Sequence, residues 1–574
     1  MKRSSFIYLA SIMVVAFAFS SCTGLKKMKK KQGVITYTLA PNPLEMHADS
    51  VVVNVTGKFP EKYYKKKVTC EITPVLKSAS GTEVALKTIK VQGEKVQDNN
   101  AVINLLAGGG FSYTDKVAYT QDMRICDVNV KIHAVVKKKF VDFEPVNVGK
   151  GTIATPGLLE KDSKAIFGKD KFVRIIPETR EANIMYVINQ SGVRPGEMSK
   201  DEMKALKKYL ANAQTNPRKD IKGVFVSSYS SPDGTEELNA KLSTNRGTSG
   251  TTAIKGEFKK YEKAKTQGFF TEKATAEDWD GFQSLMGASD IADKDLIVRV
   301  LSMYSDPIQR EKEIKNISKA YTQVADKVLP KLRRSVLTVN VDSIGRSDKE
   351  LDSTFNANPS VLSIEELLFT ATLTKDLNRQ LSIYQTTATQ NPNDWRGFNN
   401  AGAVLIQQDK NADAKAQFEK AKSLDAGNTI VLNNLGASSL RDGDFVKAEE
   451  YFKSAGGAGS EVNYNLGICA VKKADYNGAV TYFGSYCTFN AALAKLLTAN
   501  TDAANKAIDC AEDKDRDMMY YLKAIIGARS SNTDLMYNSL RAAISKNAKL
   551  ANDAKTDMEF AKYFNDDTFK SVVK

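Results

Sequence analysis

Hydrophobic and polar residues alternate through the first quarter of the chain, from about residue 34 to about residue 155. Apolar side chains occupy every second position over 68–72 and again over 126–134. This period of two is typical of a strand that buries one face. Turn-forming residues at 78–82 and 108–110 separate such runs. The pattern predicts a small β-sandwich domain over 34–155.

The middle of the chain mixes the periods of strands and helices. Apolar runs at 183–188 and 223–229 predict two strands. Between them, Ser199 and Glu202 have the spacing of a capping box, and apolar residues follow at helical intervals. A second helix is expected after the second strand. The order strand, helix, strand, helix requires a crossover and favours parallel pairing of the two strands.

The last third of the chain, from about residue 355, is helical and repetitive. Glycine, alanine, phenylalanine and alanine recur after 34 residues, as Gly402, Ala414, Phe418 and Ala421 and then as Gly436, Ala448, Phe452 and Ala455. This spacing resembles the tetratricopeptide repeat, which implies a helical solenoid over 355–574. Such solenoids hold peptides or proteins in a concave groove. The alternative is a helical scaffold without a groove ligand.

Composition argues against several kinds of chemistry. The 574 residues include only two histidines, His47 and His133, which leaves almost no candidates for Ser–His or Cys–His catalysis. The chain contains no P-loop, no dinucleotide-binding glycine motif and no His-Glu-x-x-His motif. We therefore expect no enzymatic activity, no metal site and no cofactor.

The first residues indicate export. Lys2 and Arg3 precede an apolar run over 6–19, which is short for a membrane span and has the length of a signal-peptide core. Small residues then precede Cys22, as a lipoprotein signal peptidase requires. We expect residues 1–21 to be removed and Cys22 to carry the lipid anchor. The alternative is an ordinary secretory signal with a chance cysteine.

A basic segment follows the expected anchor, over residues 22–33, with lysines at positions 26, 27, 29, 30 and 31. We expect a tether that is either solvated or in contact with anionic headgroups. Surface-exported Bacteroidota lipoproteins carry acidic residues here, so this tether resembles that of an outer-membrane lipoprotein facing the periplasm. Despite the excess of 82 basic over 67 acidic residues, an exported lipoprotein is not expected to bind nucleic acid.

Five cysteines follow Cys22. Cys70 and Cys126 both fall on predicted buried strand faces, so they form either an inter-strand disulfide or two buried thiols. The other three lie among the helical repeats at positions 469, 487 and 510, where we expect small buried apolar side chains.

The segment after the second predicted strand of the middle region carries a more specific motif. It consists of Gly234, Asn239, Leu242, Ser243 and Arg246, and a Leu-Arg-Arg run follows at residue 332. This motif resembles the OmpA C-terminal domain, a periplasmic peptidoglycan-binding module. The resemblance implies an α/β domain over 172–345 with the order βαβα…β. The chain departs from the family pattern by a helical insertion at about 263–330, before the last strand.

In that family an aspartate and the arginine hold the zwitterionic end of diaminopimelate in the peptidoglycan stem peptide, since an arginine fork suits a carboxylate. The resemblance makes Asn239 and Arg246 candidate binding residues. Ser231 stands at the position of the family's aspartate, and Asp233 is the candidate substitute for it. The alternative for Arg246 is an arginine on the surface of a helix.

The patterns together predict a multidomain protein in which a linker over 156–171 joins the β-sandwich to the OmpA-like domain and a tetratricopeptide solenoid follows. The expected function is that of a non-enzymatic outer-membrane lipoprotein on the periplasmic side. It would bind or sit against peptidoglycan and hold a protein partner, such as an outer-membrane complex, in the groove of the solenoid. The alternative is an accessory subunit of an outer-membrane secretion, insertion or uptake complex whose OmpA-like domain does not bind peptidoglycan.

Overall fold

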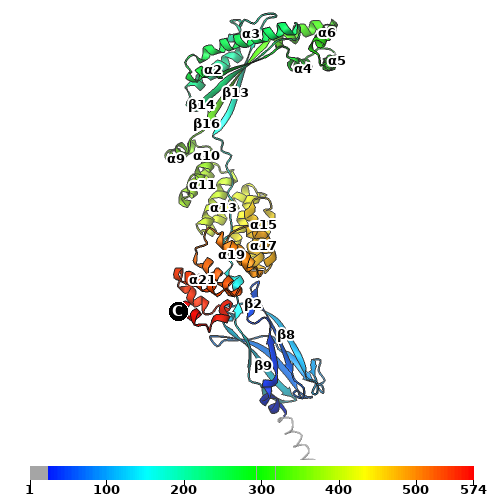
Figure 1. Ribbon diagram of the computed structural model, residues 1–574, viewed down its shortest axis with the longest axis vertical. Coiled ribbons are helices and arrows are strands. Elements are labelled where there is room, and N and C mark those ends of the chain that lie inside the picture. The colour runs from blue at the N-terminus through cyan, green and yellow to red at the C-terminus, as the bar shows by residue number, and fades with distance from the viewer. Residues whose placement is uncertain (1–23, 293, 317) are drawn as a thin grey trace, which may run out of the picture. The chain divides into compact units, whose positions relative to one another are not determined.

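The computed structural model describes residues 24–292, 294–316 and 318–574. It divides into two compact units (Figure 1). Unit 1 comprises Met1–Lys169 and Asp376–Lys574, and unit 2 comprises Asp170–Lys375. The expected multidomain arrangement, with strands in the N-terminal half and a helical C-terminal region, is confirmed. The predicted signal peptide 1–21 and the predicted lipidation site Cys22 lie outside the described residues.

Unit 1 begins with a sandwich of two sheets. One has the order β1(Thr36–Leu39), β3(Ser50–Phe59), β2(Leu44–His47) and β12(Thr152–Ile153), with β8(Gly109–Ala118) paired to β3. The other has the order β10(Lys139–Asp142), β9(Cys126–Val136), β4(Thr69–Ser78), β6(Ile89–Gly93) and β7(Ala101–Ile103), with β11(Val146–Lys150) on β9 and β5(Glu83–Ala85) on β4. Short 3₁₀ turns are η1(Gln32–Val34), η2(Gln121–Met123) and η3(Thr155–Leu158). The alternating apolar side chains of both sheets form one core.

Cys70 and Cys126 are two free buried thiols in this core, so of the two alternatives the disulfide is wrong. In the β4–β9 ladder, Cys70 lies opposite Ala134 and Cys126 lies opposite Ser78. The two cysteines are thus eight rungs apart, about 26 Å at roughly 3.3 Å per residue, which no disulfide can bridge.

The basic segment after Cys22 is not a free tether. Residues 24–30 are helical, and Leu25 and Met28, at helical spacing, are each 1% exposed in the core of the sandwich. The Tyr63 hydroxyl donates a hydrogen bond of 2.8 Å to the carbonyl of Met28. The two apolar residues among the lysines therefore hold the segment against the sandwich.

The second part of unit 1 consists of antiparallel helix pairs. After α11(Leu377–Gln390) come α12(Trp395–Gln407) with α13(Asn411–Leu424), α14(Thr429–Asp442) with α15(Phe445–Ser454), α16(Ser460–Lys472) with α17(Tyr476–Phe483), α18(Phe489–Leu497) with α19(Thr501–Asp509), and α20(Asp517–Arg529) with α21(Thr533–Lys546). The chain ends in α22(Lys549–Ala554), η8(Met558–Tyr563) and α23(Asp567–Val572). Residues 355–375, which were expected to begin the solenoid, belong to unit 2 instead.

The recurring glycines explain the 34-residue period. A Cβ atom at Gly402 would lie 2.5 Å from the ring of Phe418, and one at Gly436 would lie 2.6 Å from the ring of Phe452. Each first helix thus needs a glycine where the phenylalanine of its second helix packs against it. The 34-residue period therefore reflects a steric requirement that each helix pair repeats.

Two of the cysteines in the repeats form a disulfide, Cys487–Cys510, where small apolar side chains were expected. Cys487 precedes α18 and Cys510 follows α19. Antiparallel packing of these two helices brings the start of one beside the end of the other, which explains the pairing across 23 residues. Cys469 is a free buried thiol, as expected.

Unit 2 contains a four-stranded sheet with the order β13(Ile175–Met185), β16(Arg334–Ile344), β14(Lys219–Tyr229) and β15(Phe270–Thr275). Helices α2(Asp201–Thr215) and α3(Glu236–Lys255) pack on it. Near them are η4(Glu197–Ser199), η5(Gly256–Phe258) and η6(Glu262–Lys265). The expected parallel pairing of β13 and β14 is wrong, because β16 lies between them and is antiparallel to both. The parallel pair is β14 with β15.

Two local expectations for unit 2 also need correction. Helix α2 begins at Asp201 after Lys200, and Ser199 belongs to the preceding 3₁₀ turn, so the predicted capping box does not form. The predicted insertion at about 263–330 includes β15, which is a strand of the sheet. The helices between β15 and β16 are α4(Trp279–Gly287), α5(Lys294–Ser302), α6(Pro307–Asn316), α7(Ser318–Lys327) and α8(Leu329–Leu332). Helices α4, α5, α7 and α8 share a small core of their own.

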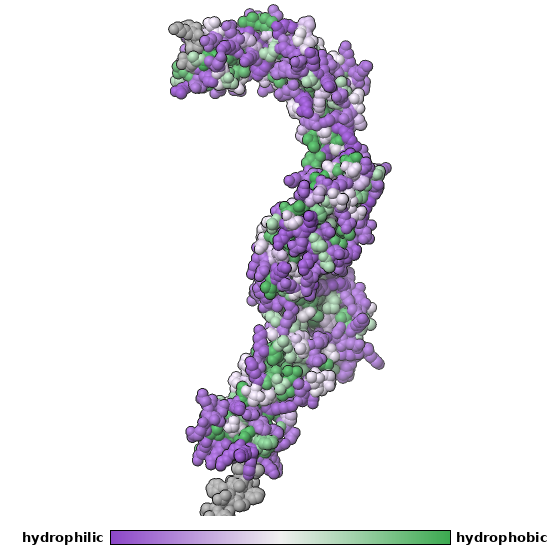
Figure 2. Space-filling model, turned by 180° about the vertical axis from the view of Figure 1, so that it is seen from behind, coloured by the Kyte–Doolittle hydropathy of each residue, from purple (hydrophilic) through white to green (hydrophobic). Residues whose placement is uncertain are grey.

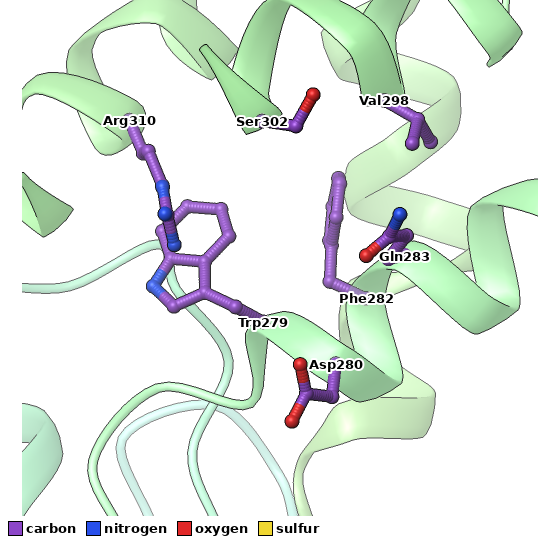
Figure 3. Close-up of a pocket in the computed structure, with 7 residues that line it drawn as sticks. All are labelled: Trp279, Asp280, Phe282, Gln283, Val298, Ser302 and Arg310. Atoms are coloured by element: carbon purple, nitrogen blue, oxygen red, sulfur yellow. The ribbon is translucent and has the colours of Figure 1, made fainter. Parts of the chain in front are cut away.

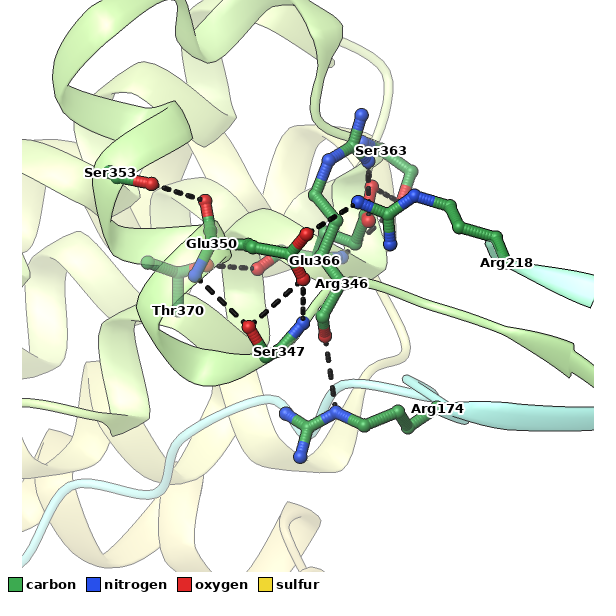
Figure 4. A network of polar contacts seen from close by, with 9 residues as sticks. All are labelled: Arg174, Arg218, Arg346, Ser347, Glu350, Ser353, Ser363, Glu366 and Thr370. Atoms are coloured by element: carbon green, nitrogen blue, oxygen red, sulfur yellow. Dashed lines mark hydrogen bonds and ion pairs between the residues drawn. The ribbon is translucent and has the colours of Figure 1, made fainter. Parts of the chain in front are cut away.

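Capping boxes do occur after β16, at the starts of α9(Asp348–Ala357) and α10(Ile364–Thr372), which flank η7(Pro359–Val361). Their glutamates also pair with arginines from the strand ends (Figure 4). Arg346 lies 2.7 Å from Glu366, and Arg218 lies 2.8 Å from Glu350. These contacts fasten α9 and α10 to the end of the sheet.

Candidate functional sites

The four candidate binding residues of the OmpA-like motif lie at the corner between β14 and α3. Ser231 and Asp233 belong to the connecting loop, and Asn239 and Arg246 are seven positions apart on one face of α3. The corner therefore does bring the four residues together. Their exposure is low, with only 1% of Arg246 accessible to solvent.

Arg246 is buried, so it is neither a solvent-accessible ligand-binding residue nor an arginine on the surface of a helix. Its guanidinium donates to the carbonyls of Gln190 at 3.0 Å, Tyr229 at 3.0 Å and Val187 at 3.4 Å, and to the Ser230 hydroxyl at 3.1 Å. The guanidinium carbon also lies 5.3 Å from the centre of the Tyr186 ring. Burial lowers the pKa of Arg246 to about 10. The side chain thus ties the 187–190 segment to the end of β14.

Arg333, which directly precedes β16, holds the other two loop residues. Its Nε donates to the Ser231 hydroxyl at 3.0 Å, and one terminal nitrogen pairs with Asp233 at 2.9 Å. The Ser231 hydroxyl in turn donates to Asp233. The Leu-Arg-Arg run in the sequence contains this arginine, but its spacing indicates only a strand start. The partnership with Asp233 depends on the central position of β16.

Asn239 completes the cluster. Its amide donates to the carbonyl of Gly234 at 3.0 Å and to Glu277 at 3.4 Å, and burial raises the pKa of Glu277. We call Ser231, Asp233, Asn239, Arg246 and Arg333 the arginine cluster. Its side chains are hydrogen-bonded to one another and to other groups of the chain, so a stem peptide would have to displace these bonds in order to bind here.

The predicted linker forms a second ordered polar site. Residues 160–168, which we call the strap, run in extended form across α12, α14, α16 and α18, the first helices of four successive pairs. Four asparagines each donate to and accept from the backbone of one strap residue. In each pair the backbone N–H donates to the asparagine Oδ1, and the asparagine Nδ2 donates to the carbonyl of the same strap residue. The pairs are Glu160 with Asn490 (3.0 and 2.8 Å) and Lys164 with Asn465 (2.8 and 2.9 Å). They continue with Ile166 and Asn434 (2.7 and 2.8 Å) and with Gly168 and Asn400 (2.6 and 2.9 Å).

Two further asparagines link three of the four, Asn400, Asn434 and Asn465, into a continuous ladder. Asn399 and Asn433 donate at 3.0 Å to the carbonyls of Ile166 and Lys164, and each also accepts from the asparagine of the next repeat. The six asparagines are at most 1% exposed. A primary amide offers both a donor and an acceptor, so it can pair with a peptide unit regardless of that residue's side chain. The ladder therefore recognises extended backbone.

Side chains of the strap add a few contacts. Asp162 accepts from the Tyr464 hydroxyl at 2.5 Å and from Asn490 at 2.7 Å, and burial raises the pKa of the Asp162 carboxyl. Glu160 pairs with Arg516 at 2.7 Å. A Cβ atom at Gly168 would lie 2.8 Å from the Trp395 ring, so only glycine fits there without rearrangement.

These contacts correct two expectations. Residues 156–171 are not a free linker, and the inner face of the helical repeats is not an open groove for a partner, because the chain's own strap fills it. The sequence did contain a signal for the strap. The pairs Asn399-Asn400 and Asn433-Asn434 recur at the 34-residue period, although buried polar residues are unusual at such positions.

A small pocket lies among the inserted helices of unit 2 (Figure 3). Its volume is about 180 Å³, and Trp279, Phe282 and Arg310 contribute to its lining. The guanidinium carbon of Arg310 lies 5.2 Å from the centre of the Trp279 ring. Ligand pockets usually enclose roughly 300–1,000 Å³, so this one is too small for a drug-sized ligand.

The described residues contain no group of three or more His, Cys, Asp or Glu side chains placed to hold a metal ion. Within the same residues, the helices all fall short of the length and apolar character needed to cross a membrane.

No family model and no curated protein matches this chain. Solved structures of helical-repeat proteins do. A tetratricopeptide repeat protein from Parabacteroides merdae is 11% identical, covering 39% of this chain and 89% of its own, with a TM-score of 0.28. PilW, a type IV pilus biogenesis factor, is 15% identical over 38% and 99%, with a TM-score of 0.28. The Cut9–Hcn1 complex is 14% identical over 65% and 83%, with a TM-score of 0.33. Because these scores are low, the repeat assignment rests on the chain's own period and helix pairing.

Proposed function

We propose that this protein is a non-enzymatic outer-membrane lipoprotein that faces the periplasm and serves as an accessory scaffold of an outer-membrane protein complex. The signal-peptide pattern that ends at Cys22 supports the lipid anchor and the location. The helical repeats of unit 1 support the scaffolding role, since repeat solenoids offer long surfaces to protein partners. With the strap in the groove, the partner would contact the outer helices of the repeats or unit 2.

Unit 2 supplies an OmpA-like domain in this proposal. The sheet order β13-β16-β14-β15 and the motif at the start of α3 both fit that family. The observation that carries the choice of function is the burial of Arg246, which donates four hydrogen bonds within the chain. Together with Ser231 in place of the family's aspartate, it favours a domain that keeps the fold without gripping diaminopimelate.

Sedimentation with purified sacculi tests this point. The chain from residue 24 to residue 574 should remain in the supernatant, or should sediment in a manner that free diaminopimelate does not reverse. A matched Asp233→Asn variant should behave identically. Sedimentation that diaminopimelate reverses, and that Asp233→Asn abolishes while the variant stays folded, would contradict the proposal.

The second candidate is peptidoglycan binding at the arginine cluster. The observation that favours it is the position of the four motif residues at one corner, where Arg333, about 100 residues later in the sequence, binds Ser231 and Asp233. Crosslinking in native membranes distinguishes the candidates. A stoichiometric protein partner without a muropeptide adduct supports the accessory scaffold, and a muropeptide adduct on unit 2 supports the second candidate.

A further inference from the structure

The two ends of the β-sandwich differ in what they face. Asp49, directly before β3, lies 2.6 Å from Lys472 of the helical repeats, and Arg124, near the start of β9, lies 3.3 Å from Asp553. The start of β3 and the start of β9 therefore point toward the repeats. The opposite end, which we call the distal end, carries the end of β3 at Phe59 and the end of β9 at Val136.

Five segments gather at the distal end. They are residues 24–34, 58–68, 93–96, 104–109 and 136–140. Backbone hydrogen bonds of 2.7 Å join Lys62 to Leu105 and Lys95 to Lys66, and Tyr63 binds the carbonyl of Met28. The register of β9 with β4 and β10 places the 137–138 turn at the same end. The strand pairing therefore assembles one surface from distant parts of the sequence.

This surface is strongly basic. The five segments contain fourteen lysines, at positions 26, 27, 29, 30, 31, 58, 62, 65, 66, 67, 95, 137, 138 and 139, and only two acidic residues, Glu61 and Glu94. Glu94 lies 3.5 Å from Lys66, and Glu144 from a neighbouring segment lies 2.7 Å from Lys29. The two acids and Glu144 offset only a small part of the positive charge. On the face shown in Figure 2, hydrophilic residues, drawn in purple, predominate at this end of the sandwich.

Apolar side chains project among the lysines. Leu106 is 66% exposed at the tip of the 104–109 loop, Phe140 is 61% exposed after the 137–138 turn, and Val34 is 49% exposed after the N-terminal helix. Single exposed apolar residues are ordinary on a protein surface. Here three large ones lie at the same lysine-rich end of the sandwich. Lysines that attract anionic headgroups and apolar tips that enter the interface are the two elements of peripheral membrane binding.

We propose that the distal end of the β-sandwich binds the surface of a bilayer that contains anionic phospholipid. The described chain begins at this end, since residues 24–30 pack there. A lipid anchor on Cys22 would therefore place the lysines and the three apolar tips against the headgroups. The proposal extends the function proposed above by assigning the sandwich a partner, but the surface itself is tested without the anchor.

The test is sedimentation with lipid vesicles, using the chain from residue 24 to residue 574, which lacks the lipidation site. We expect binding to vesicles that contain phosphatidylglycerol, no binding to vesicles of phosphatidylcholine alone, and loss of binding as the salt concentration rises. Changing Lys62, Lys65, Lys66 and Lys67 together to glutamine should weaken binding roughly tenfold or more. A control variant with Lys410, Lys420, Lys514 and Lys549 changed to glutamine, on the helical repeats, should bind like the wild type.

A second variant, Leu106→Ser, separates the apolar contribution from the charge. It should weaken binding to the anionic vesicles while leaving the salt dependence in place. Equal binding by the two four-lysine variants, or equal binding to neutral vesicles, would overturn the proposal. Binding to purified sacculi in preference to vesicles would also overturn it. Because the anchor is absent from the assay, none of these results depends on whether Cys22 is lipidated.

Discussion

The strap site of unit 1 and the arginine cluster of unit 2 both use buried polar side chains to bind backbone carbonyls, but the chemistry of the two sites differs. The asparagines of the strap site are neutral, and each donates and accepts. Arg246 is a cation that only donates, and its burial carries the cost of desolvating a charge. The strap site joins an extended segment to four repeats, whereas the arginine cluster joins loops and strand ends within one small domain.

This difference indicates what each site can tolerate. Replacing one asparagine of the neutral amide ladder leaves only one or two polar groups without a hydrogen-bond partner, and the other asparagines keep their bonds to the backbone. A buried guanidinium holds several carbonyls at once, so its removal leaves all of them unpaired and opens a cavity. We therefore expect the arginine cluster to fail as a unit and the strap site to fail in steps.

The largest expected effect comes from Arg246→Ala. It should lower the free energy of unfolding of unit 2 by about 3–5 kcal/mol, because the carbonyls of residues 187, 190 and 229 lose their buried donor. Urea unfolding followed by circular dichroism measures the change. Arg180→Ala, at a half-exposed arginine of β13, is the matched control and should cost less than about 1 kcal/mol. Similar costs for both variants would mean that Arg246 is not a structural tie.

The next effect concerns the backbone of the strap. Lys164→Pro should cost roughly 2–4 kcal/mol, since proline removes the N–H that Asn465 accepts. Lys164→Ala keeps that N–H and loses the ammonium contacts with the Tyr464 and Tyr486 rings and the attraction to Asp162, so it should cost less than about 1 kcal/mol. Thermal unfolding of unit 1 measures both. If alanine cost as much as proline, recognition would depend on the side chain.

A single step of the ladder should cost less. Asn434→Ala leaves the N–H of Ile166 without its acceptor, while the Ile166 carbonyl keeps its bond from Asn399. The expected loss is about 2 kcal/mol in the unfolding of unit 1. Asn477→Ala, at an exposed position of α17, should be nearly neutral. Hydrogen exchange at the Ile166 amide would provide a local measure, and unchanged protection in Asn434→Ala would contradict the ladder.

The smallest effect is a pH dependence at the strap. The pKa of Asp162 is raised by burial in the folded state, with Glu160 adding to the shift and Lys164 opposing it. Since the folded state binds this proton more readily than the unfolded chain, the stability of unit 1 should rise as the pH falls through that raised pKa. Asp162→Asn should remove this part of the pH dependence. An unchanged pH profile in Asp162→Asn would show that the carboxyl does not contribute.

The repeats were predictable from sequence because their packing is local. The contact of Gly402 with Phe418 joins residues 16 positions apart within one helix pair, and it recurs wherever the pair recurs. The position of the motif residues at a strand-to-helix corner was predictable for the same reason. The resemblance to the OmpA C-terminal domain identified the motif residues, but it did not indicate that Arg246 is buried.

The remaining features depend on contacts between distant segments. The strap has no periodic apolar pattern, since asparagine side chains hold its backbone. The partners of Arg246 are mostly carbonyls, which every residue carries. The pairing of Cys487 with Cys510 required the packing of α18 on α19, and the central position of β16 required the whole sheet. The packing of Leu25 and Met28 against the sandwich was not predicted, because these residues lie among lysines and the charge of the segment indicated a tether.

The direction of the strap has a consequence for biosynthesis. The strap runs from Asn490 of the later repeats to Asn400 of the first, so it crosses the repeats in the direction opposite to their order in the chain. Glu160 and Asn490 are 330 residues apart. A ribosome that adds roughly 5–20 residues per second needs about 17–66 seconds to make that interval. All of unit 2 is therefore synthesised after the strap and before the helices that bind it. Docking of the strap can be completed only near the end of translation.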